Sequence, residues 1–199
     1  MKQQESDFQY EKKQDAFERL LYELYTFGPI RLVDDNGHPD LVSDNSRLCC
    51  KHEPFLEIVE LMQENRLVES LEVKRERILI LTDKGHLTGM LFAQRSRIDK
   101  NCNCQRCCAA FDEFLRLLLQ CRKVQLVLNE EGHPHIIADE KNLCCRNKPF
   151  LYVLCKLEQQ RLVEISEDFL CSITDRGRKL AHMILLPNSA VFAESARLN

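Results

Sequence analysis

Gly37-His38-Pro39 returns later in the chain as Gly132-His133-Pro134, 95 residues further on. The same offset relates several other strings of the first half of the chain to strings of the second half. A constant offset at many positions is the mark of a duplicated unit, so it predicts the architecture before any secondary structure is assigned. The other matched strings are Leu48-Cys49-Cys50 with Leu143-Cys144-Cys145, Pro54-Phe55 with Pro149-Phe150, and Arg66-Leu67-Val68-Glu69 with Arg161-Leu162-Val163-Glu164.

One later match has a different offset. Thr82-Asp83-Lys84-Gly85 corresponds to Thr174-Asp175-Arg176-Gly177 at an offset of 92, so one copy has lost three residues before this motif. The chain has 199 residues, which is enough for two small domains. The predicted parts are a polar N-terminal extension (1–13), a first domain (14–93), a basic, cysteine-rich linker (94–108), a second domain (109–187) and a C-terminal tail (188–199).

The composition indicates a soluble globular protein, with 44% hydrophobic and 30% charged residues. The net charge of -3 gives no global electrostatic case for nucleic acid, so any such case must be local. No apolar run reaches the length of a bilayer span, and the polar N-terminus lacks the apolar segment of a signal peptide. We therefore expect a cytoplasmic or nuclear protein, neither secreted nor in a membrane, whose 11 cysteines are mostly free thiols or metal ligands rather than disulfides.

Each copy predicts the same series of elements. Apolar residues between Ala16 and Tyr25 recur at helical spacing, and Gly28-Pro29 ends that helix. Two β-prone runs then flank the Gly-His-Pro turn, which predicts a hairpin, with a single short strand and a loop as the alternative. Asp44 and Asp139 are expected to cap a short helix that carries the paired cysteines on its inner face.

A longer helix is expected to follow in each copy, with Pro54 or Pro149 in its first turn, where proline is tolerated. In copy one a β-hairpin with a charged tip at 74–77 comes next, and copy two compresses this hairpin. A last helix is predicted over 83–93 and over 175–186. The expected core residues of the longer helices are Phe55, Ile58, Val59 and Met62 in copy one, and Phe150, Val153, Leu154 and Leu157 in copy two.

This order of elements resembles a winged-helix domain. The likeness is carried by Arg66-Leu67-Val68-Glu69 followed by Leu81-Thr82-Asp83-Lys84-Gly85, and by Ile173-Thr174-Asp175-Arg176-Gly177, which are similar to the end of the wing in many bacterial and archaeal regulators. It covers roughly 14–93 and 109–187 and identifies a superfamily and no particular member. The resemblance implies an α+β fold of two tandem winged-helix (helix-turn-helix) domains. The Gly-His-Pro hairpin is longer than the usual connection at that place.

In that fold the longer helix would enter a DNA major groove, and the hairpin tip would touch the backbone or the minor groove. The charge is divided between the copies, because the longer helix is acidic in copy one and basic in copy two, while the wings are the reverse. Solvated faces without a binding role explain such charges equally well. The predicted nucleic-acid-binding residues are Arg146, Asn147, Lys148 and Lys156 in the second helix, Lys74, Arg75 and Arg77 in the first wing, and Arg95 and Arg97 in the linker.

The linker also contains four closely spaced cysteines, whose soft sulfur ligands suit zinc. Their C-x-C-x-x-C-C spacing is not that of a standard zinc finger, and free thiols, small buried hydrophobes or a redox pair are the alternatives. The cysteines of the repeated Leu-Cys-Cys strings are more simply explained by core packing. The predicted metal ligands are Cys102, Cys104, Cys107 and Cys108.

The sequence contains no phosphate-binding glycine loop, nucleophile elbow or His-Glu-x-x-His string, so we expect no enzyme. Apart from the possible zinc, no cofactor is expected. The leading hypothesis is a tandem winged-helix protein that binds duplex DNA as a transcriptional regulator. The rival is a winged-helix scaffold that binds a protein partner and no DNA, because fold does not settle function. Residues 1–15 could also form a dimer helix, so a homodimer is left open.

Overall fold

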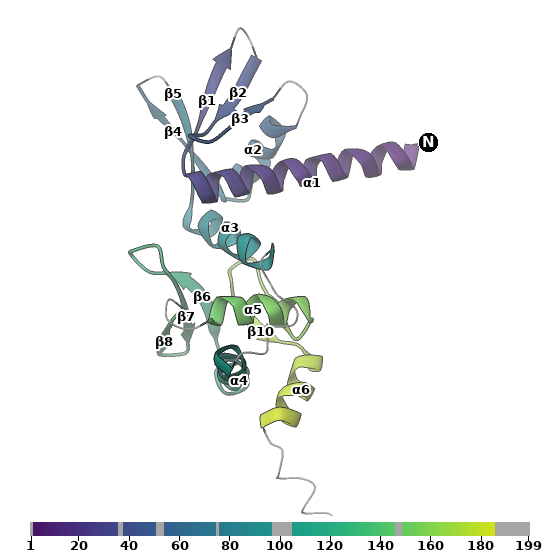
Figure 1. Ribbon diagram of the computed structural model, residues 1–199, viewed down its shortest axis with the longest axis vertical. Helices are drawn as coiled ribbons and strands as arrows, with labels where there is room; N and C mark the ends of the chain where they lie inside the picture. The colour runs from purple at the N-terminus through teal and green to yellow at the C-terminus, as the bar shows by residue number, and fades with distance from the viewer. Residues whose placement is uncertain are drawn as a thin grey trace, which may run out of the picture. The chain divides into compact units, whose positions relative to one another are not determined.

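A computed structural model of the chain describes residues 2–35, 38–50, 54–74, 76–96, 105–145 and 149–185. The chain divides into two compact parts, unit 1 (Met1–Ala93) and unit 2 (Gln94–Asn199). Within the described residues, each unit runs through the same order of elements: one helix, three strands, a second helix, two strands and a last helix (Figure 1). The fold is therefore α+β, with six helices and small antiparallel sheets in that part of the chain.

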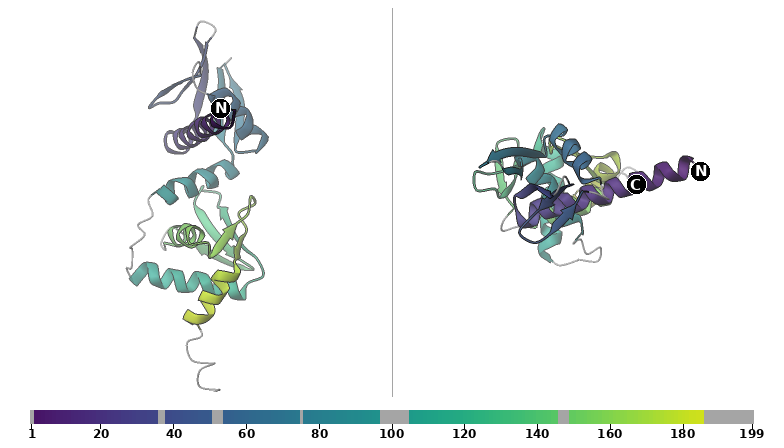
Figure 2. Two further views of the ribbon diagram at one scale, coloured as in Figure 1. Left: turned by 90° about the vertical axis from the view of Figure 1, so that its right-hand side faces the viewer. Right: turned by 90° about the horizontal axis from the view of Figure 1, so that it is seen from above.

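Unit 1 is built on a five-stranded antiparallel sheet with the strand order β3-β2-β1-β5-β4. Two of its helices, α1 and α2, lie side by side, and both contact the sheet (Figures 1 and 2). The elements are α1 (Lys2–Phe27), β1 (Ile30–Asp35), β2 (His38–Val42), β3 (Arg47–Cys49), α2 (Phe55–Glu64), β4 (Val68–Val73), β5 (Glu76–Leu81) and α3 (Asp83–Ser96).

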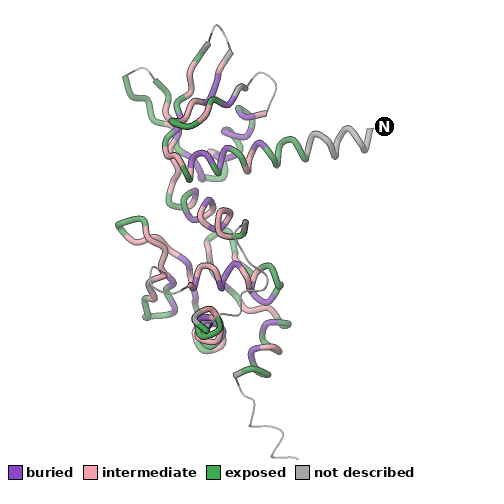
Figure 3. Tube along the Cα trace, viewed as in Figure 1, coloured by how far each residue is buried: buried purple, intermediate pink, exposed green. Residues whose placement is uncertain are grey.

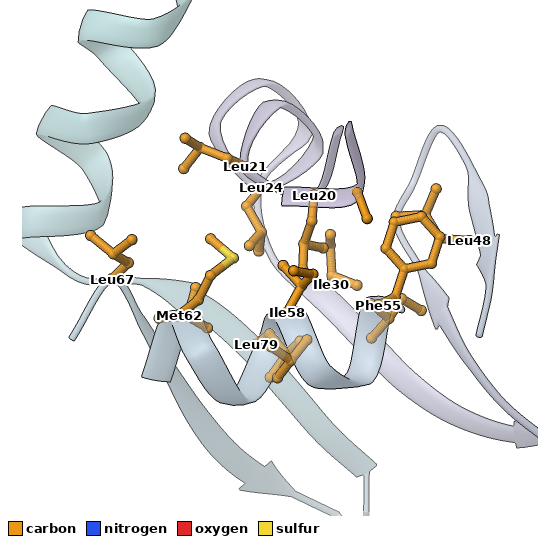
Figure 4. Packing of buried hydrophobic residues seen from close by; sticks show 14 residues of the cluster. Leu20, Leu21, Leu24, Ile30, Leu48, Phe55, Ile58, Met62, Leu67 and Leu79 are labelled. Atoms are coloured by element: carbon orange, nitrogen blue, oxygen red, sulfur yellow. The ribbon is translucent and has the colours of Figure 1, made fainter. Parts of the chain in front are cut away.

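The core of unit 1 lies between these two helices and the sheet. Leu20 of α1, Phe55 of α2 and Leu79 of β5 point towards one another there, and each is at most 1% exposed (Figure 4). The predicted core face of α2 is confirmed. Among residues 11–27 of α1, for which burial is described, the buried residues begin at Ala16, while residues 11–15 are exposed (Figure 3). The apolar spacing that begins at Ala16 thus marks a packed segment of the helix, as predicted.

Unit 2 repeats this arrangement with a shorter second hairpin, in which each strand has three residues. Its two small sheets have the orders β6-β7-β8 and β10-β9. An antiparallel bridge between Gln125 and Leu170 joins them, and the N–H of Leu126 donates to the carbonyl oxygen of Phe169 at 3.0 Å. The elements are α4 (Gln105–Gln120), β6 (Val124–Leu128), β7 (Pro134–Ala138), β8 (Lys141–Cys144), α5 (Phe150–Gln159), β9 (Val163–Ile165), β10 (Cys171–Ile173) and α6 (Asp175–Leu185).

The strand registers show that the sequence repeat is also a structural repeat. Leu41 pairs with Leu48 in unit 1, and the residues 95 positions later, Ile136 and Leu143, pair in unit 2. The β4–β5 hairpin has six residue pairs and the β9–β10 hairpin three, so the three-residue loss shortens the second hairpin. The first predicted hairpin is confirmed as β1–β2 and β6–β7, which excludes the single-strand alternative.

The short helix expected around the paired cysteines is wrong. Cys49 ends strand β3 and Cys144 ends strand β8, so Asp44 and Asp139 precede strands and cap no helix. Pairing with β2 inserts Leu48 into the core beside Leu41 and covers an edge of β2 that a helix would leave unpaired. The described residues therefore contain no helix-turn-helix before α2, which is the main departure from the winged-helix expectation.

The first repeat of the Thr-Asp-x-Gly motif fastens the last helix of unit 1 to the chain that leaves α2. The hydroxyl of Thr82 donates to the carbonyl oxygen of Arg66 at 2.6 Å, and its backbone N–H donates to that of Leu67 at 3.0 Å. A Cβ at Gly85 would overlap the carbonyl oxygen of Leu67. The motif is thus explained as a structural clasp, and the same clasp recurs at Thr174.

The edges of the predicted domains differ from the observed elements at three places. Helix α3 continues to Ser96, three residues beyond the predicted end of the first domain at 93. Residues 2–13, expected as a separate polar extension, continue α1 without a break. Residues 105–108, expected in the linker, form the first turn of α4. The predicted tail, 188–199, lies outside the described residues.

Candidate functional site

Unit 2 contains an open cleft of about 740 Å³ between the end of α5 and the exposed face of α6. Its lining combines three cationic side chains with two glutamines and three apolar residues, and no acidic residue belongs to it. The lining residues are Gln159, Gln160, Arg161, Leu162, Arg176, Lys179, Leu180 and Met183. A concave, cationic surface of this kind is suited to an anionic ligand.

The chain reversal after α5 places Arg161 at the cleft. Gln160 caps α5, and Arg161 then adopts a left-handed backbone conformation with φ 57°. Its N–H donates to the carbonyl oxygen of Glu158 at 2.8 Å, and the N–H of Leu162 donates to that of Leu157 at 2.9 Å. These two bonds satisfy carbonyl groups in the last turn of the helix and turn the chain towards β9.

The clasp of unit 2 then brings α6 against this turn. The hydroxyl of Thr174 donates to the carbonyl oxygens of Arg161, at 2.9 Å, and Leu162, at 3.1 Å. The N–H of Gly177 donates back to the Thr174 hydroxyl oxygen at 3.0 Å. Arg176 lies between Thr174, which precedes α6, and Gly177 in the first turn of α6. It lines the same cleft as Arg161, although 15 positions separate them in the sequence.

The three cations of the cleft repel one another. Arg161, Arg176 and Lys179 are all exposed, and within the described residues none of them forms an ion pair. Like charges gathered without counter-charges raise the local potential and attract anions from solution. On α6 the cleft face carries Arg176, Lys179 and Met183, at spacings of three and four residues, whereas Arg178 does not line the cleft.

The equivalent positions of unit 1 reproduce only part of this charge. Arg161 and Arg176 correspond to Arg66 and Lys84, which are also cations. At an offset of 92 residues, however, Lys179 corresponds to Leu87 and Met183 corresponds to Leu91, and both leucines are buried. The third cation and the exposed methionine are therefore particular to the second repeat. Sequence reasoning missed the cleft, although a comparison of the two last helices contained the signal: a lysine and a methionine stand where the first copy has two leucines.

Four of the nine residues predicted to bind nucleic acid lie within the described residues: Lys74, Arg77, Arg95 and Lys156. Lys74 lies exposed at the tip of the β4–β5 hairpin, with φ 52°. The Nε of Arg77 donates to the Oγ of Ser70 at 2.6 Å, so this guanidinium is held by its own hairpin. Arg75, Arg97, Arg146, Asn147 and Lys148 lie outside the described residues.

Two further predicted residues are already engaged within unit 2. Arg95 binds Glu158 through two contacts, from Nε to Oε2 at 2.9 Å and from Nη2 to Oε1 at 2.7 Å. Such a two-pronged pair neutralises the guanidinium and reduces its availability for phosphate. Lys156 is half-buried and lines a second cavity of about 260 Å³, together with Cys107 and Cys108 of α4.

The predicted zinc site has only two of its ligands in the described chain. Cys107 and Cys108 are consecutive residues of α4, so their side chains leave the helix about 100° apart. Among the residues that the structure describes, no group of three histidine, cysteine, aspartate or glutamate side chains is arranged to hold a metal ion. Cys102 and Cys104 lie outside those residues, and zinc binding stays a prediction.

Two other thiols of unit 2 are structural. Desolvation by burial raises the pKa of Cys155 to about 12 and the pKa of Cys171 to about 12. Both groups are therefore protonated at neutral pH and unsuited to bind metal as thiolates. Cys50 and Cys145, from the repeated strings, are half-buried, and each thiol contacts the carbonyl oxygen two residues before it.

Comparison of the chain with known protein families, with curated proteins and with solved structures found no match. The helices of the described segments include none with the length and apolar character needed to cross a membrane. The class to which the structure assigns this chain is an α+β protein of two repeated units, of which the second contains a cationic cleft.

Proposed function

We propose that this chain binds nucleic acid and that the cleft of unit 2 holds phosphate groups. The observation that carries the proposal is the convergence of Arg161, Arg176 and Lys179 on one concave surface that has no acidic lining residue. Phosphate contacts from arginine and lysine supply most of the affinity of non-specific nucleic-acid binding. The net charge of -3 does not oppose this, because the positive charge is local to one face of α6.

We further propose that both units are divergent winged-helix domains, as a duplicated transcriptional regulator would have. The hairpin after the longer helix and the closing helix of each unit support this. The departure is the β2–β3 segment, and its counterpart β7–β8, in place of a helix before α2 or α5. Because no helix-turn-helix is present in the described residues, the proposed phosphate contacts are assigned to the α5–α6 cleft. The nucleic-acid contacts predicted for Arg146, Asn147 and Lys148 are proposed in addition to those of the cleft.

The test is salt-dependent binding of labelled oligonucleotides, measured by fluorescence anisotropy. If three cations contact phosphate, log K should fall with log salt at a slope of about -2.7, since each contact contributes about -0.9 on duplex DNA. That slope corresponds to about a 40-fold loss of affinity between 50 and 200 mM salt. The double substitution Arg176→Ala and Lys179→Ala should reduce the slope to about -1.

Matched controls are available in both units. Arg178→Ala removes an exposed cation from the same helix without touching the cleft, and Lys84→Ala removes the unit 1 counterpart of Arg176. Both controls should retain most of the salt dependence. Wild-type protein that fails to bind any oligonucleotide at micromolar concentration in low salt would overturn the proposal.

The protein-scaffold alternative is favoured by one observation in unit 1. The exposed face of α2 carries Glu57, Glu60 and Glu64 around Leu61, which is 45% exposed. A carboxylate-rich helix repels phosphates, so unit 1 is better suited to a protein partner than to DNA. Two results together would favour this alternative. The wild-type protein would bind no nucleic acid, and it would capture a protein partner that the variants Leu61→Ser and Glu60→Lys no longer capture.

A further inference from the structure

One side of the unit 2 cleft is lined by apolar side chains, which phosphate binding does not require. Met183 lines the cleft and is 73% exposed, while Leu162 and Leu180 provide further apolar surface beside it. An exposed methionine on a cationic surface does not stabilise a phosphate, because its thioether is apolar and only a weak hydrogen-bond acceptor. The cleft therefore joins two kinds of surface, one for charge and one for an apolar or aromatic group.

The shape of the cleft adds a second constraint. Its volume of about 740 Å³ lies within the range of sites for small molecules, roughly 300–1,000 Å³. Contacts to the backbone of a duplex need no such cavity, because phosphates lie on the outside of the double helix and side chains reach them from a flat or convex surface. A base that has left the stack needs both a cavity and an apolar wall.

From these two observations, and resting on the proposed function, we infer that the cleft binds single-stranded nucleic acid with one unstacked base inside it. Arg176, Lys179 and Arg161 hold the phosphates that flank this base. Met183 lies seven residues after Arg176, about 10 Å further along α6, and packs against the face of the base, since thioether groups make favourable contacts with aromatic rings.

Gln160 supplies the polar contact of the cleft to the edge of the base. Its side-chain amide has both donor and acceptor groups, so it can bind the edges of several bases. Gln159 is less available, because its Nε2 donates to the backbone carbonyl oxygen of Arg95 at 3.4 Å. We therefore expect weak sequence preference, as is usual where stacking and phosphate contacts supply the affinity.

Unit 1 does not offer such a site at the equivalent place. Leu91, the counterpart of Met183, is 3% exposed, and Leu87, the counterpart of Lys179, is 5% exposed. Only substitutions in unit 2 should therefore weaken the binding of single-stranded nucleic acid. Lys84→Ala in unit 1 provides an internal comparison within the full chain.

The experiment compares three labelled probes of equal length in one low-salt buffer: single-stranded DNA, single-stranded RNA and duplex DNA. We expect both single strands to bind at least tenfold more tightly than the duplex. Met183→Ser should weaken single-strand binding about fivefold or more, which is the lower end of the effect of losing one stacked base. It should leave duplex binding unchanged. The control Ile184→Ser alters an exposed apolar neighbour on α6 that does not line this cleft.

The outcomes separate the inference from the proposal on which it rests. Duplex binding as tight as single-strand binding, or a Met183→Ser variant that binds all probes like the wild type, overturns the single-strand inference and leaves the proposed function intact. If Arg176→Ala with Lys179→Ala also leaves binding and its salt dependence unchanged, the cleft is not the phosphate site and both ideas fail.

Discussion

The hydroxyl of Thr174 lies 2.9 Å from the carbonyl oxygen of Arg161, and its hydrogen bond joins the two sides of the cationic cleft in unit 2. The equivalent bond in unit 1 connects Thr82 with Arg66 at 2.6 Å. The two repeats thus keep one clasp, and in unit 2 it joins Arg161 to the helix that carries Arg176 and Lys179.

Replacing Thr174 by valine should loosen the cleft while keeping the shape of the side chain. The variant loses its bonds to the carbonyl oxygens and leaves the N–H of Gly177 without its acceptor, at an expected cost of about 1–2 kcal/mol in the free energy of unfolding. Urea denaturation and oligonucleotide anisotropy measure the two effects. Thr82→Val is the matched control, because it should destabilise unit 1 similarly and leave oligonucleotide affinity unchanged; equal loss of affinity in both variants would contradict this account.

Gly177→Ala should be more damaging than the threonine change. An added Cβ would overlap the carbonyl oxygen of Leu162, a backbone atom that cannot move without breaking the clasp, so we expect a loss of about 2 kcal/mol or more in stability. Thermal denaturation followed by circular dichroism provides the measurement. Gly132→Asn serves as the control, because no atom lies within 4 Å of that Cβ and asparagine tolerates the positive φ of 74°. A wild-type melting temperature in Gly177→Ala would show that the close approach is unimportant.

The cysteines of unit 2 should differ strongly in reactivity. A pKa of about 12 leaves about one Cys155 or Cys171 thiol in ten thousand as thiolate at pH 8, and burial also blocks access. Cys108 is exposed and should be alkylated before Cys155 and Cys171. Brief iodoacetamide treatment of native protein, followed by peptide mass spectrometry, gives the order of modification. Denatured protein is the control, in which all these thiols should react alike; early modification of Cys171 would contradict its buried position.

Asp139 should make unit 2 less stable in acid. The backbone N–H of Lys123, which donates to this carboxylate at 2.9 Å, is the main cause that lowers its pKa in the folded state. A lowered pKa means that the stabilisation is fully present above the unfolded value of about 3.9 and is lost as pH falls through the folded value. Asp139→Asn keeps a residue that tolerates φ 51° but removes the charge. The urea midpoint should therefore fall less between pH 7 and pH 3 in the variant than in the wild type. If it falls equally in both proteins, groups other than Asp139 cause the acid sensitivity.

Much of the fold follows from local patterns in the sequence. Phe55 and Met62 lie seven residues apart on one face of a helix, and this periodicity predicts both the helix and its buried side. The strand at Leu48 could not be found in the same way. It has three residues and no periodicity of its own, and its conformation is set by pairing with Leu41 across a turn.

The candidate site was less accessible to prediction than the fold. The expected contacts relied on charges along single elements, yet Arg77 and Arg95 are held by Ser70 and Glu158. Such partners come from elsewhere in the chain, so the net charge of a segment does not show which cations stay available. The charges of Arg176 and Lys179 were visible, but their convergence with Arg161 was not.

The sequence alone determined the duplication, the order of most elements and the clasp motif, because these depend on residue spacing and on local backbone preferences that both copies retain. The tertiary structure decided that the paired cysteines end strands, that several predicted contacts are engaged, and that three cations and Met183 share one cleft. These features arise from hydrogen bonds and packing between residues far apart in the chain, such as Thr174 with Arg161. Such pairings depend on how the whole unit folds, and a local reading of residue types does not contain them.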